Sequence, residues 1–304
     1  MEKRFYSNGK LLITGEYVVL DGAVAFAIPT QPGQDLYVQF HEKPEIHWDS
    51  FDVKGKCWFS AVFSLEDFSF KTETSKSVAK SLSEILQHAR ILNPEFLSNH
   101  QGFRITTHLD FPRDWGLGSS STLIANIAEW AEIDPYQLLE KTFGGSGYDI
   151  ASAKNDLPIL FRKAEKNIEV NPCELQWKFE DRLFFVHLNK KQNSRSGISH
   201  YRKFPVKKEV IQHISEISKA IPTVENLSDF ETLIKEHEHI ISKTIQLPTV
   251  QETLFPDYSG VVKSLGAWGG DFVLATGNRE KQEYFKEKGY STQISFNKMF
   301  KQNP

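Results

Sequence analysis

The stretch that decides the fold is FPRDWGLGSSSTLIANIAEW, from Phe111 to Trp130. Before it, apolar residues alternate with more polar ones from Phe103 to Leu109, which predicts a half-buried strand. After its serines, Leu123, Ile124 and Ile127 recur at helical spacing. The predicted order is therefore a strand, a glycine-rich turn, a run of serines and a helix.

The turn predicts a site for an anion. Its residues are Gly116, Leu117, Gly118, Ser119 and Ser120. Glycines leave room for a ligand, and the free N–H groups at the positive end of a helix attract phosphate. The alternative is an ordinary strand-to-helix turn with serine caps. The stretch lacks the lysine of a GxxxxGK[ST] loop, and Ser121 replaces the last glycine of GxGxxG.

Composition restricts the classes of protein that fit. The chain has 304 residues, enough for one large or two medium domains, and its 39% of hydrophobic residues can build a sizeable core. Apolar runs stay well short of the ~20 residues of a membrane helix, and the polar N-terminus does not look like a secretory leader. Two cysteines predict no disulfide framework, so we expect a cytoplasmic protein. A net charge of −3 predicts no general attraction to nucleic acid or to a membrane.

Three charged residues stand out in apolar or glycine-rich surroundings. Lys10 and Glu16 interrupt the apolar region near the N-terminus, where surface charge is the alternative interpretation. Asp149 follows Gly144-Gly145-Ser146-Gly147, a tight loop that would present its carboxylate. A helix cap formed by Asp149 is the alternative there.

The rest of the pattern predicts an α+β fold in layers. Lys3–Thr14 predicts two short strands around Asn8. Helices are expected at 75–92, 209–221 and 227–245, strands at 182–188, 271–276 and 290–296, and a domain boundary near 171–178.

Two charged runs have competing interpretations. In Glu236-His237-Glu238-His239, helical residues two apart point in different directions, so we predict a solvated helix with one half-buried histidine and not a metal site. A basic cluster surrounds Asn193 and is either a solvated face or an anion-binding segment. Its members are Lys190, Lys191, Arg195, Arg202 and Lys203.

Three separated stretches resemble the motifs of the GHMP kinases, a family that includes galactokinase, homoserine kinase, mevalonate kinase and phosphomevalonate kinase. The first motif is similar to residues 9–20, GKLLITGEYVVL, and the second to Pro112 with the glycine turn. The third is similar to residues 263–271, KSLGAWGGD, and the segment 145–151, GSGYDIA, resembles the catalytic-base segment. GEY, SGYDIA and the GG-Asp ending look most like phosphomevalonate kinases. Asn8 and Trp268 depart from the family, which usually has proline and glycine there.

The resemblance implies a two-domain α+β enzyme. Residues 1–175 would form an ATP-binding domain like the second domain of ribosomal protein S5, and residues 176–304 a ferredoxin-like domain. The N–H groups of Gly116, Leu117, Gly118, Ser119 and Ser120 would hold the ATP phosphates. Ser120, with Glu140 as a substitute for the family's glutamate, would bind Mg²⁺.

The resemblance also implies roles in catalysis and in acceptor binding. Asp149 would take a proton from the acceptor or orient it, and Lys10 would neutralise developing charge. The acceptor side would consist of Glu16, Ser194, Arg195, Gly269, Gly270 and Asp271.

The expected function is transfer of the γ-phosphate of ATP to a hydroxyl or phosphate of a small acid, phosphomevalonate or mevalonate in isoprenoid biosynthesis. Alternatives are galactokinase, homoserine kinase, diphosphomevalonate decarboxylase, or a non-catalytic protein that binds a nucleotide or metabolite on the same fold. The joint presence of Lys10, Ser120 and Asp149 favours an enzyme. We expect a monomer or homodimer that acts on a small molecule and binds neither nucleic acid nor membrane.

Overall fold

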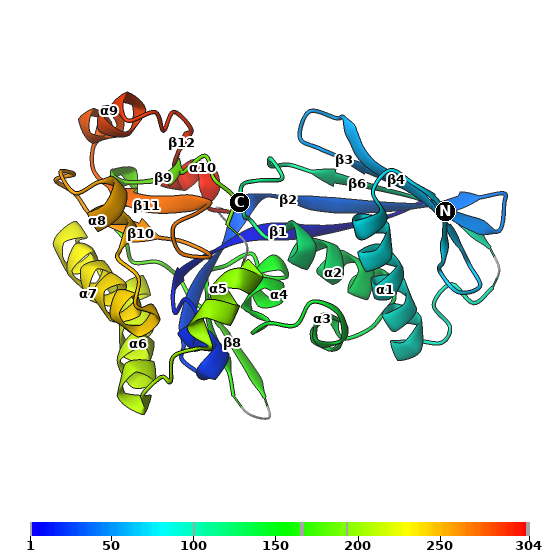
Figure 1. Ribbon diagram of the computed structural model, residues 1–304, viewed down its shortest axis with the longest axis horizontal. Helices are drawn as coiled ribbons and strands as arrows, with labels where there is room; N and C mark the ends of the chain where they lie inside the picture. Colours follow the sequence, from blue (N-terminus) through cyan, green and yellow to red (C-terminus); the bar gives the residue numbers. More distant parts are fainter. Residues whose placement is uncertain (1, 100, 165–166, 193, 302–304) are drawn as a thin grey trace. The chain divides into compact units, whose positions relative to one another are not determined.

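The computed structural model describes residues 2–99, 101–164, 167–192 and 194–301 (Figure 1). The chain divides into two compact units. Unit 1 contains the described residues of Met1–Gly9, Pro32–Arg113 and Gly118–Lys154. Unit 2 contains those of Lys10–Gln31, Asp114–Leu117 and Asn155–Pro304. These units interleave along the sequence, and the division into domains 1–175 and 176–304 stays a prediction.

The first strand corrects the prediction for the N-terminus. Lys3–Thr14 is one continuous strand, β1, and not two short strands. The turn-favouring residues Ser7 and Asn8 are buried in it, and the Ser7 hydroxyl donates to Asn126 Oδ1 at 2.7 Å. A buried side-chain partner therefore overrides the local preference for a turn.

Unit 1 is a sheet with helices packed on one face (Figure 1). The strand order is β5-β4-β3-β6-β2, with β3 and β6 parallel and the other neighbours antiparallel. The strands are β2 (Ala25–His41), β3 (Glu45–Phe51), β4 (Cys57–Ser64), β5 (Phe70–Glu73) and β6 (Gly102–Leu109). The helices are α1 (Lys76–Leu92), α2 (Ser119–Trp130), α3 (Pro135–Thr142) and α4 (Tyr148–Ala153). Alternate residues of β2 and β6, such as Val38 and Ile105, form the core with α1 and α2, as the period of two predicts.

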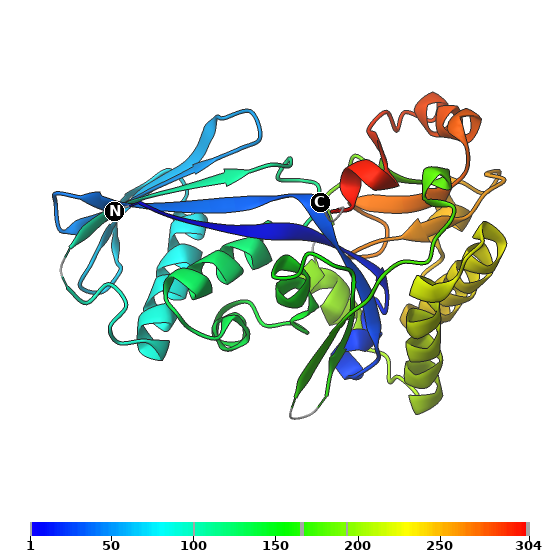
Figure 2. The ribbon, with the colours of Figure 1, turned by 180° about the vertical axis from the view of Figure 1, so that it is seen from behind.

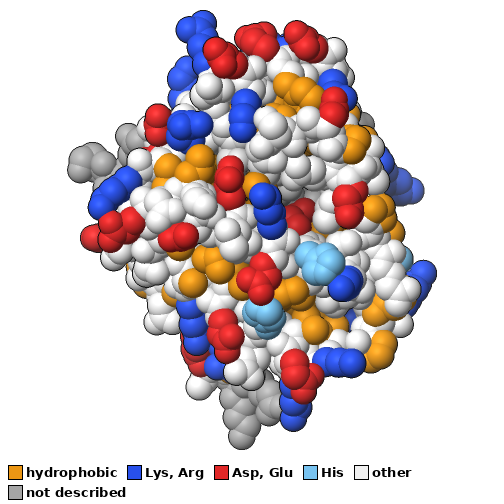
Figure 3. All heavy atoms as spheres, turned by 90° about the vertical axis from the view of Figure 1, so that its left-hand side faces the viewer, with side chains coloured by type: hydrophobic (Ala, Val, Ile, Leu, Met, Phe, Trp, Pro, Cys, Tyr) orange, Lys and Arg blue, Asp and Glu red, His pale blue; other side chains and the backbone are white. Residues whose placement is uncertain are grey.

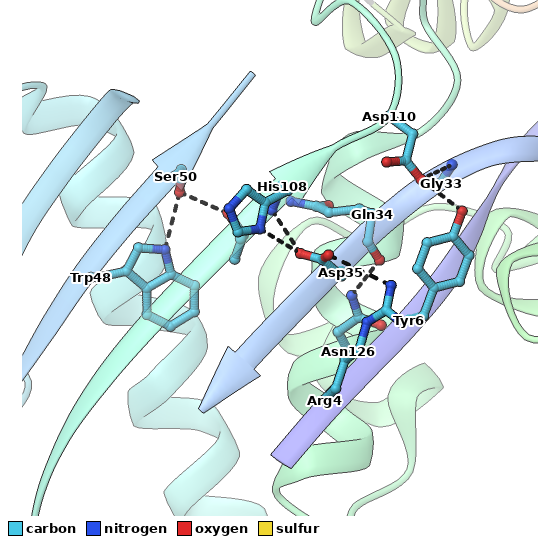
Figure 4. A network of polar contacts seen from close by, with 11 residues as sticks. Arg4, Tyr6, Gly33, Gln34, Asp35, Trp48, Ser50, His108, Asp110 and Asn126 are labelled. Atoms are coloured by element: carbon cyan, nitrogen blue, oxygen red, sulfur yellow. Dashed lines mark hydrogen bonds and ion pairs between the residues drawn. The ribbon is translucent and has the colours of Figure 1, made fainter. Parts of the chain in front are cut away.

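Polar contacts on β1, β2 and β6 hold the chain just before the glycine turn (Figure 4). Tyr6 donates its hydroxyl to Asp110 at 2.9 Å, and the N–H of Gly33 approaches the same oxygen at 3.4 Å. Asp35 accepts from the backbone N–H of His108 at 2.9 Å. The residue that precedes Phe111 is thereby tied to two other strands of unit 1.

Unit 2 contains a second, antiparallel sheet of order β10-β11-β9-β12 (Figure 2). Its strands are β9 (Leu183–His187), β10 (Val262–Ser264), β11 (Phe272–Thr276) and β12 (Gln293–Ser295). The first part of β2 pairs with β7 (Ile159–Lys163), which forms a hairpin with β8 (Ile168–Pro172). The helices are α5 (Ser194–Tyr201), α6 (Lys208–Ala220), α7 (Leu227–Ile245), α8 (Val250–Leu254), α9 (Arg279–Glu287) and α10 (Phe296–Met299), with short 3-10 turns at Val18–Asp21, Glu180–Arg182 and Ile221–Thr223.

The apolar strands and the helical periodicities are confirmed, and the last strand is shorter than predicted. Every residue of β9 and β11 is buried. Of the strand expected at 290–296, three residues pair with β9, and the chain then turns into α10. The ring of Phe296 stacks on Phe185 with centroids 6.1 Å apart, so packing against β9 ends the strand there.

The prediction for the acidic and histidine-rich run of α7 was wrong for His237 and Glu238, whereas Glu236 and His239 are exposed. His237 and Glu238 are both buried and do not belong to a solvated face. They follow Phe230 and Ile234 on the face that α7 packs into unit 2. Within the described part of the chain, no cluster of three or more metal-ligating side chains occurs, and no helix is long and apolar enough to cross a bilayer.

Candidate active site

The glycine turn has the backbone that its sequence predicts. Gly116 has a φ of +67° and Gly118 a φ of +90°, values in the left-handed region that favours glycine. Gly118 occupies the cap position of α2 and has no side chain with which to cap it. Ser119 is half-buried and Ser120 exposed. The first N–H groups of α2 are thus left uncapped by the residue before them, as an anion site requires.

Lys10 lies beside this turn within unit 2. Its backbone N–H donates to the carbonyl of Leu117 at 3.0 Å. The side chain is only 8% exposed, so the interpretation of Lys10 as an ordinary surface charge is excluded. The first motif and the glycine turn, distant in sequence, therefore meet directly.

Asp271, at the end of the third motif, lies against the same turn. A Cβ built on Gly116 would be 2.4 Å from Asp271 Cγ, so the carboxylate occupies the space beside the glycine. The backbone N–H of Gln192 approaches Asp271 Oδ1 at 3.4 Å. Burial raises the pKa of Asp271, while this N–H and the charge of Lys10 oppose the rise. Unit 2 thus brings Lys10, Gly116 and Asp271 together.

The loop of the third motif is tightly wound. Trp268 adopts a φ of +45° and Gly269 a φ of +83°. The indole of Trp268 is buried, and its Nε1 donates to the Pro248 carbonyl at 2.9 Å. Trp268 thus adopts a left-handed backbone conformation of the kind that favours glycine and packs its ring into unit 2. Glycine is required at position 270 because the chain at Gln192 lies very close: a Cβ at Gly270 would be 2.3 Å from Gln192 Cβ.

Glu16 lies in the interior of unit 2. Its side chain is 1% exposed, and Oε1 pairs with Lys263 Nζ at 2.5 Å. Surface charge is excluded for Glu16 as it is for Lys10. Lys263 belongs to the segment that resembles the third motif, but the sequence predicted no role for it. The available signal was a lysine inside the apolar run Val261–Leu265.

Asp149 lies in the first turn of α4 and is half-buried. Gly147, with a φ of +94°, occupies the cap position, so Asp149 is not the cap of this helix. Helices α3 and α4 both pack against α2 within unit 1. Glu140, on α3, is exposed. Lys10 belongs to unit 2, and its predicted action on Asp149 stays a prediction.

Ser194 and Arg195 begin a helix, α5, in a segment that the sequence did not predict to be helical. Both are exposed, and Asn193 lies outside the described residues. Helix α5 is anchored in unit 2 by Tyr201, whose ring stacks on Tyr17 with centroids 5.5 Å apart. Gly197 permits the approach, since a Cβ there would be 2.6 Å from the Tyr17 hydroxyl.

Comparison with known proteins supports the fold strongly. No protein-family model and no curated protein matches the sequence. Among solved structures, phosphomevalonate kinase of Streptococcus pneumoniae, in complex with phosphomevalonate and AMPPNP, matches with a TM-score of 0.68 and 13% identity over 96% of this chain and 99% of that chain. Mevalonate kinase of Methanococcus jannaschii matches with a TM-score of 0.64 and 16% identity over 95% and 94%. Galactokinase of Lactococcus lactis, in complex with galactose, matches with a TM-score of 0.66 and 14% identity over 94% and 88%.

These neighbours are kinases of small molecules, and they extend over nearly the whole chain. The chain therefore has the α+β fold of the GHMP kinases, and the resemblance drawn from the motifs is confirmed at the level of the fold. At identities of 13–16%, the structural similarity establishes the fold and does not establish the activity. The activity has to be argued from the site.

Proposed function

We propose that this protein is an ATP-dependent kinase of small molecules that phosphorylates a hydroxyl or phosphate group of a small acid. The observation that carries the proposal is the meeting of Lys10, Gly116 and Asp271 in unit 2. These residues come from the first, second and third motifs. Phosphoryl transfer needs positioned charges and backbone donors more than covalent chemistry, and this group of residues supplies both.

The residues of the glycine turn fit a magnesium nucleotide. Gly116 and Gly118 add no side chains to the turn, and the cap position of α2 carries no side-chain acceptor. The N–H groups of the turn would hold the phosphates, with the Ser120 hydroxyl and Glu140 as ligands for Mg²⁺. Bound there, ATP would supply the phosphoryl group, and Mg²⁺ would neutralise charge on its oxygens.

The acceptor that we propose is phosphomevalonate or mevalonate. Such an acid needs cations, and on the face drawn in Figure 3 acidic and basic side chains are interspersed. The positive charge must therefore come from particular residues, of which Lys10 and Arg195 are our candidates. Asp149 would accept the proton of an attacking hydroxyl. An acceptor phosphate needs no base, and Asp149 would then orient it.

A panel of acceptors tests the proposal. ADP release is measured with ATP, Mg²⁺ and mevalonate, phosphomevalonate, galactose or homoserine, and the product is identified by ³¹P NMR. We expect ADP release that depends on one of the first two compounds, and either a new phosphomonoester or a new diphosphate. Nucleotide binding without ADP release on any acceptor would instead support the non-catalytic alternative.

A further inference from the structure

A group of charged side chains lies inside unit 2, away from any surface. We call it the interior charge cluster; it consists of Glu16, His237, Glu238 and Lys263. Lys263 and His237 have an exposed fraction of 0%, Glu16 of 1% and Glu238 of 4%. They come from the turn after β1, from α7 and from the middle of β10. Charged residues are almost never buried to this degree unless they are paired.

Lys263 is the centre of the interior charge cluster. Its Nζ lies 2.5 Å from Glu16 Oε1 and 3.0 Å from Glu238 Oε1, and it also donates to the carbonyl of Ser264. The Ser264 hydroxyl donates to Glu238 Oε2 at 2.8 Å. His237 Nε2 is 3.2 Å from Glu16 Oε2 and accepts from the N–H of Gly15 at 2.9 Å. The four side chains therefore form one connected network.

The network has one negative charge too many if both of its carboxylates are ionised. A single ammonium faces two carboxylates, and an uncompensated charge in a protein interior is costly. An imidazole nitrogen that accepts from Gly15 has no proton to give to Glu16. Accordingly, Glu16 Oε2 has no hydrogen-bond partner among the residues that the structure describes. One additional proton, placed on Glu16, balances the charge and removes the repulsion between Oε2 and the imidazole nitrogen.

The titration behaviour of the surrounding groups agrees with this placement. Burial raises the pKa of Glu16 to about 7, although Lys263 opposes the rise. Burial lowers the pKa of His237 well below its usual value, so the imidazole stays neutral. Burial alone would lower the pKa of Lys263, but Glu16 and Glu238 raise it overall. Burial and the nearby Glu16 raise the pKa of Tyr17 to about 12. Of these groups, Glu16 is the one that changes charge close to neutral pH.

The interior charge cluster joins two backbone segments that carry strain. The turn of the first motif contains Tyr17 with a φ of +63°, and the loop of the third motif contains Trp268 with a φ of +45°, values that strain a residue with a side chain. The loop of the third motif begins directly after Ser264 and ends at Asp271, against Gly116. Strained backbone persists only where surrounding contacts hold it in place. The link between Glu16 and Lys263 is such a contact, because it ties the turn to the start of the loop.

We propose that Glu16 and Lys263 are positioning residues for the anion site of unit 2, and that a proton held by Glu16 keeps the third-motif loop fixed to the first-motif turn. Neither side chain touches a ligand in this scheme. Loss of the proton leaves a buried negative charge and favours opening of the loop. The role of the loop in anion binding rests on the proposed function, whereas the proton-dependent link between loop and turn does not.

Hydrogen–deuterium exchange of the full-length protein tests this link without a ligand. Protection factors, corrected for the intrinsic exchange rate, are measured from pH 6 to pH 8.5 for the amides of 265–271. The strand β9 serves as the internal reference. We expect protection of the loop to fall by about 10-fold over this range, since opening returns Glu16 to a solvated carboxylate with an ordinary pKa. Constant protection of the wild-type loop would overturn the proposal.

Three variants complete the test. Glu16→Gln keeps the shape of the protonated side chain, so its loop should be protected to the same degree at every pH. Lys263→Met should lose about 10-fold or more of the loop protection relative to β9, because the link itself is removed. Lys178→Met is the matched control, since Lys178 pairs with Glu225 at 2.5 Å on the surface of the same unit.

The outcomes separate this inference from the proposed function. A Glu16→Gln protein with the pH dependence of the wild type contradicts it, as does Lys263→Met with the loop protection of Lys178→Met. If Lys263→Met does not fold, the comparison of Glu16→Gln with the wild type decides. A protein that phosphorylates none of the acceptors and still shows proton-dependent loop protection would refute the kinase assignment and retain the inference.

Discussion

Asp149 is the carboxylate on which the proposed chemistry depends. Replacing it by asparagine keeps the shape of the side chain and removes the base and the charge. We expect Asp149→Asn to lower turnover by about 100-fold or more, the effect of losing a positioned base, and to leave the affinity for AMPPNP within about 2-fold. Steady-state kinetics and calorimetry measure the two quantities. The exposed Asp181→Asn is the control, and wild-type turnover in a folded Asp149→Asn protein would refute the assignment.

Arg195 tests the acceptor side of the site. It is exposed in the first turn of α5, and a guanidinium can bind a phosphate or carboxylate through two N–H groups. Arg195→Ala should raise the acceptor KM by about 10-fold, or ~1.4 kcal/mol, and leave the KM for ATP unchanged. Lys203→Ala, another exposed cation of the basic cluster, should change neither value. If Arg195→Ala also changes neither value, the cluster acts only as a solvated face.

The sequence identified the important side chains more successfully than it predicted their positions in the fold. Lys10 and Glu16 could be identified from their position in an apolar stretch, but the local sequence by itself favoured surface charge. The partner that keeps Glu16 buried, Lys263, is 247 residues away along the chain. A window of neighbouring residues contains no information about such a partner.

The glycine turn before α2 allows the close approach of Asp271 to be tested. Gly116→Ala places a Cβ 2.4 Å from Asp271 Cγ and also strains a φ of +67°. Gly144 has the same φ of +67° and nothing within 4 Å of its Cβ position, so Gly144→Ala measures the backbone strain alone. We expect Gly116→Ala to lose at least ~1 kcal/mol more stability than Gly144→Ala, and to weaken AMPPNP binding as well.

A second replacement identifies the source of that loss. Asp271→Gly removes the side chain that the new Cβ would meet, at a position with a φ of +54°. The double variant, Gly116→Ala with Asp271→Gly, should recover the part of the stability loss that is due to the clash. The coupling energy between the two positions should then be about 1 kcal/mol or more. Chemical denaturation of the four proteins measures this cycle. Additive effects of Gly116→Ala and Asp271→Gly would mean that the two residues do not contact each other.

Helices and apolar strands could be predicted where one period dominates the sequence. The helix expected at 227–245 is observed as α7, and the helix expected at 75–92 begins one residue later as α1. The predictions failed where a residue distant in sequence determines the local structure. In β1, for example, the buried Ser7 donates a hydrogen bond to Asn126 of α2. Helix α5 was missed because short helices depend on tertiary contacts, here the stacking of Tyr201 on Tyr17.

For the molecule as a whole, the order of the motifs was more informative than overall sequence similarity. Solved structures with 13–17% identity match almost the entire chain, whereas no family model does. Glycine is favoured at Gly116, Gly118 and Gly269 because their positive φ values admit few other residues. Trp268 shows that such a position tolerates a bulky residue when its side chain can be buried elsewhere.

The stability of the whole protein should depend on pH through Glu16. The pKa of this buried carboxyl is raised from 4.5 to about 7 in the folded protein, so folding favours its protonated form. Its contribution to stability is therefore complete below about pH 4.5, decreases as the pH rises toward 7, and stays constant above that value. His237 acts in the opposite direction, because its lowered pKa makes the folded state less stable as the pH falls below 6.5.

Comparison with Glu16→Gln isolates the contribution of Glu16, since His237 and Asp271 titrate in both proteins. We expect the free energy of unfolding of the wild type, minus that of the variant, to decrease between pH 5 and pH 7 by about 2 kcal/mol. Urea titrations at several pH values measure this difference. His213→Gln is the control at an exposed side chain, paired with Glu236, and should leave the difference close to zero. A difference between wild type and Glu16→Gln that does not vary with pH would mean that the folded protein keeps Glu16 ionised, with both carboxylates sharing the charge of Lys263.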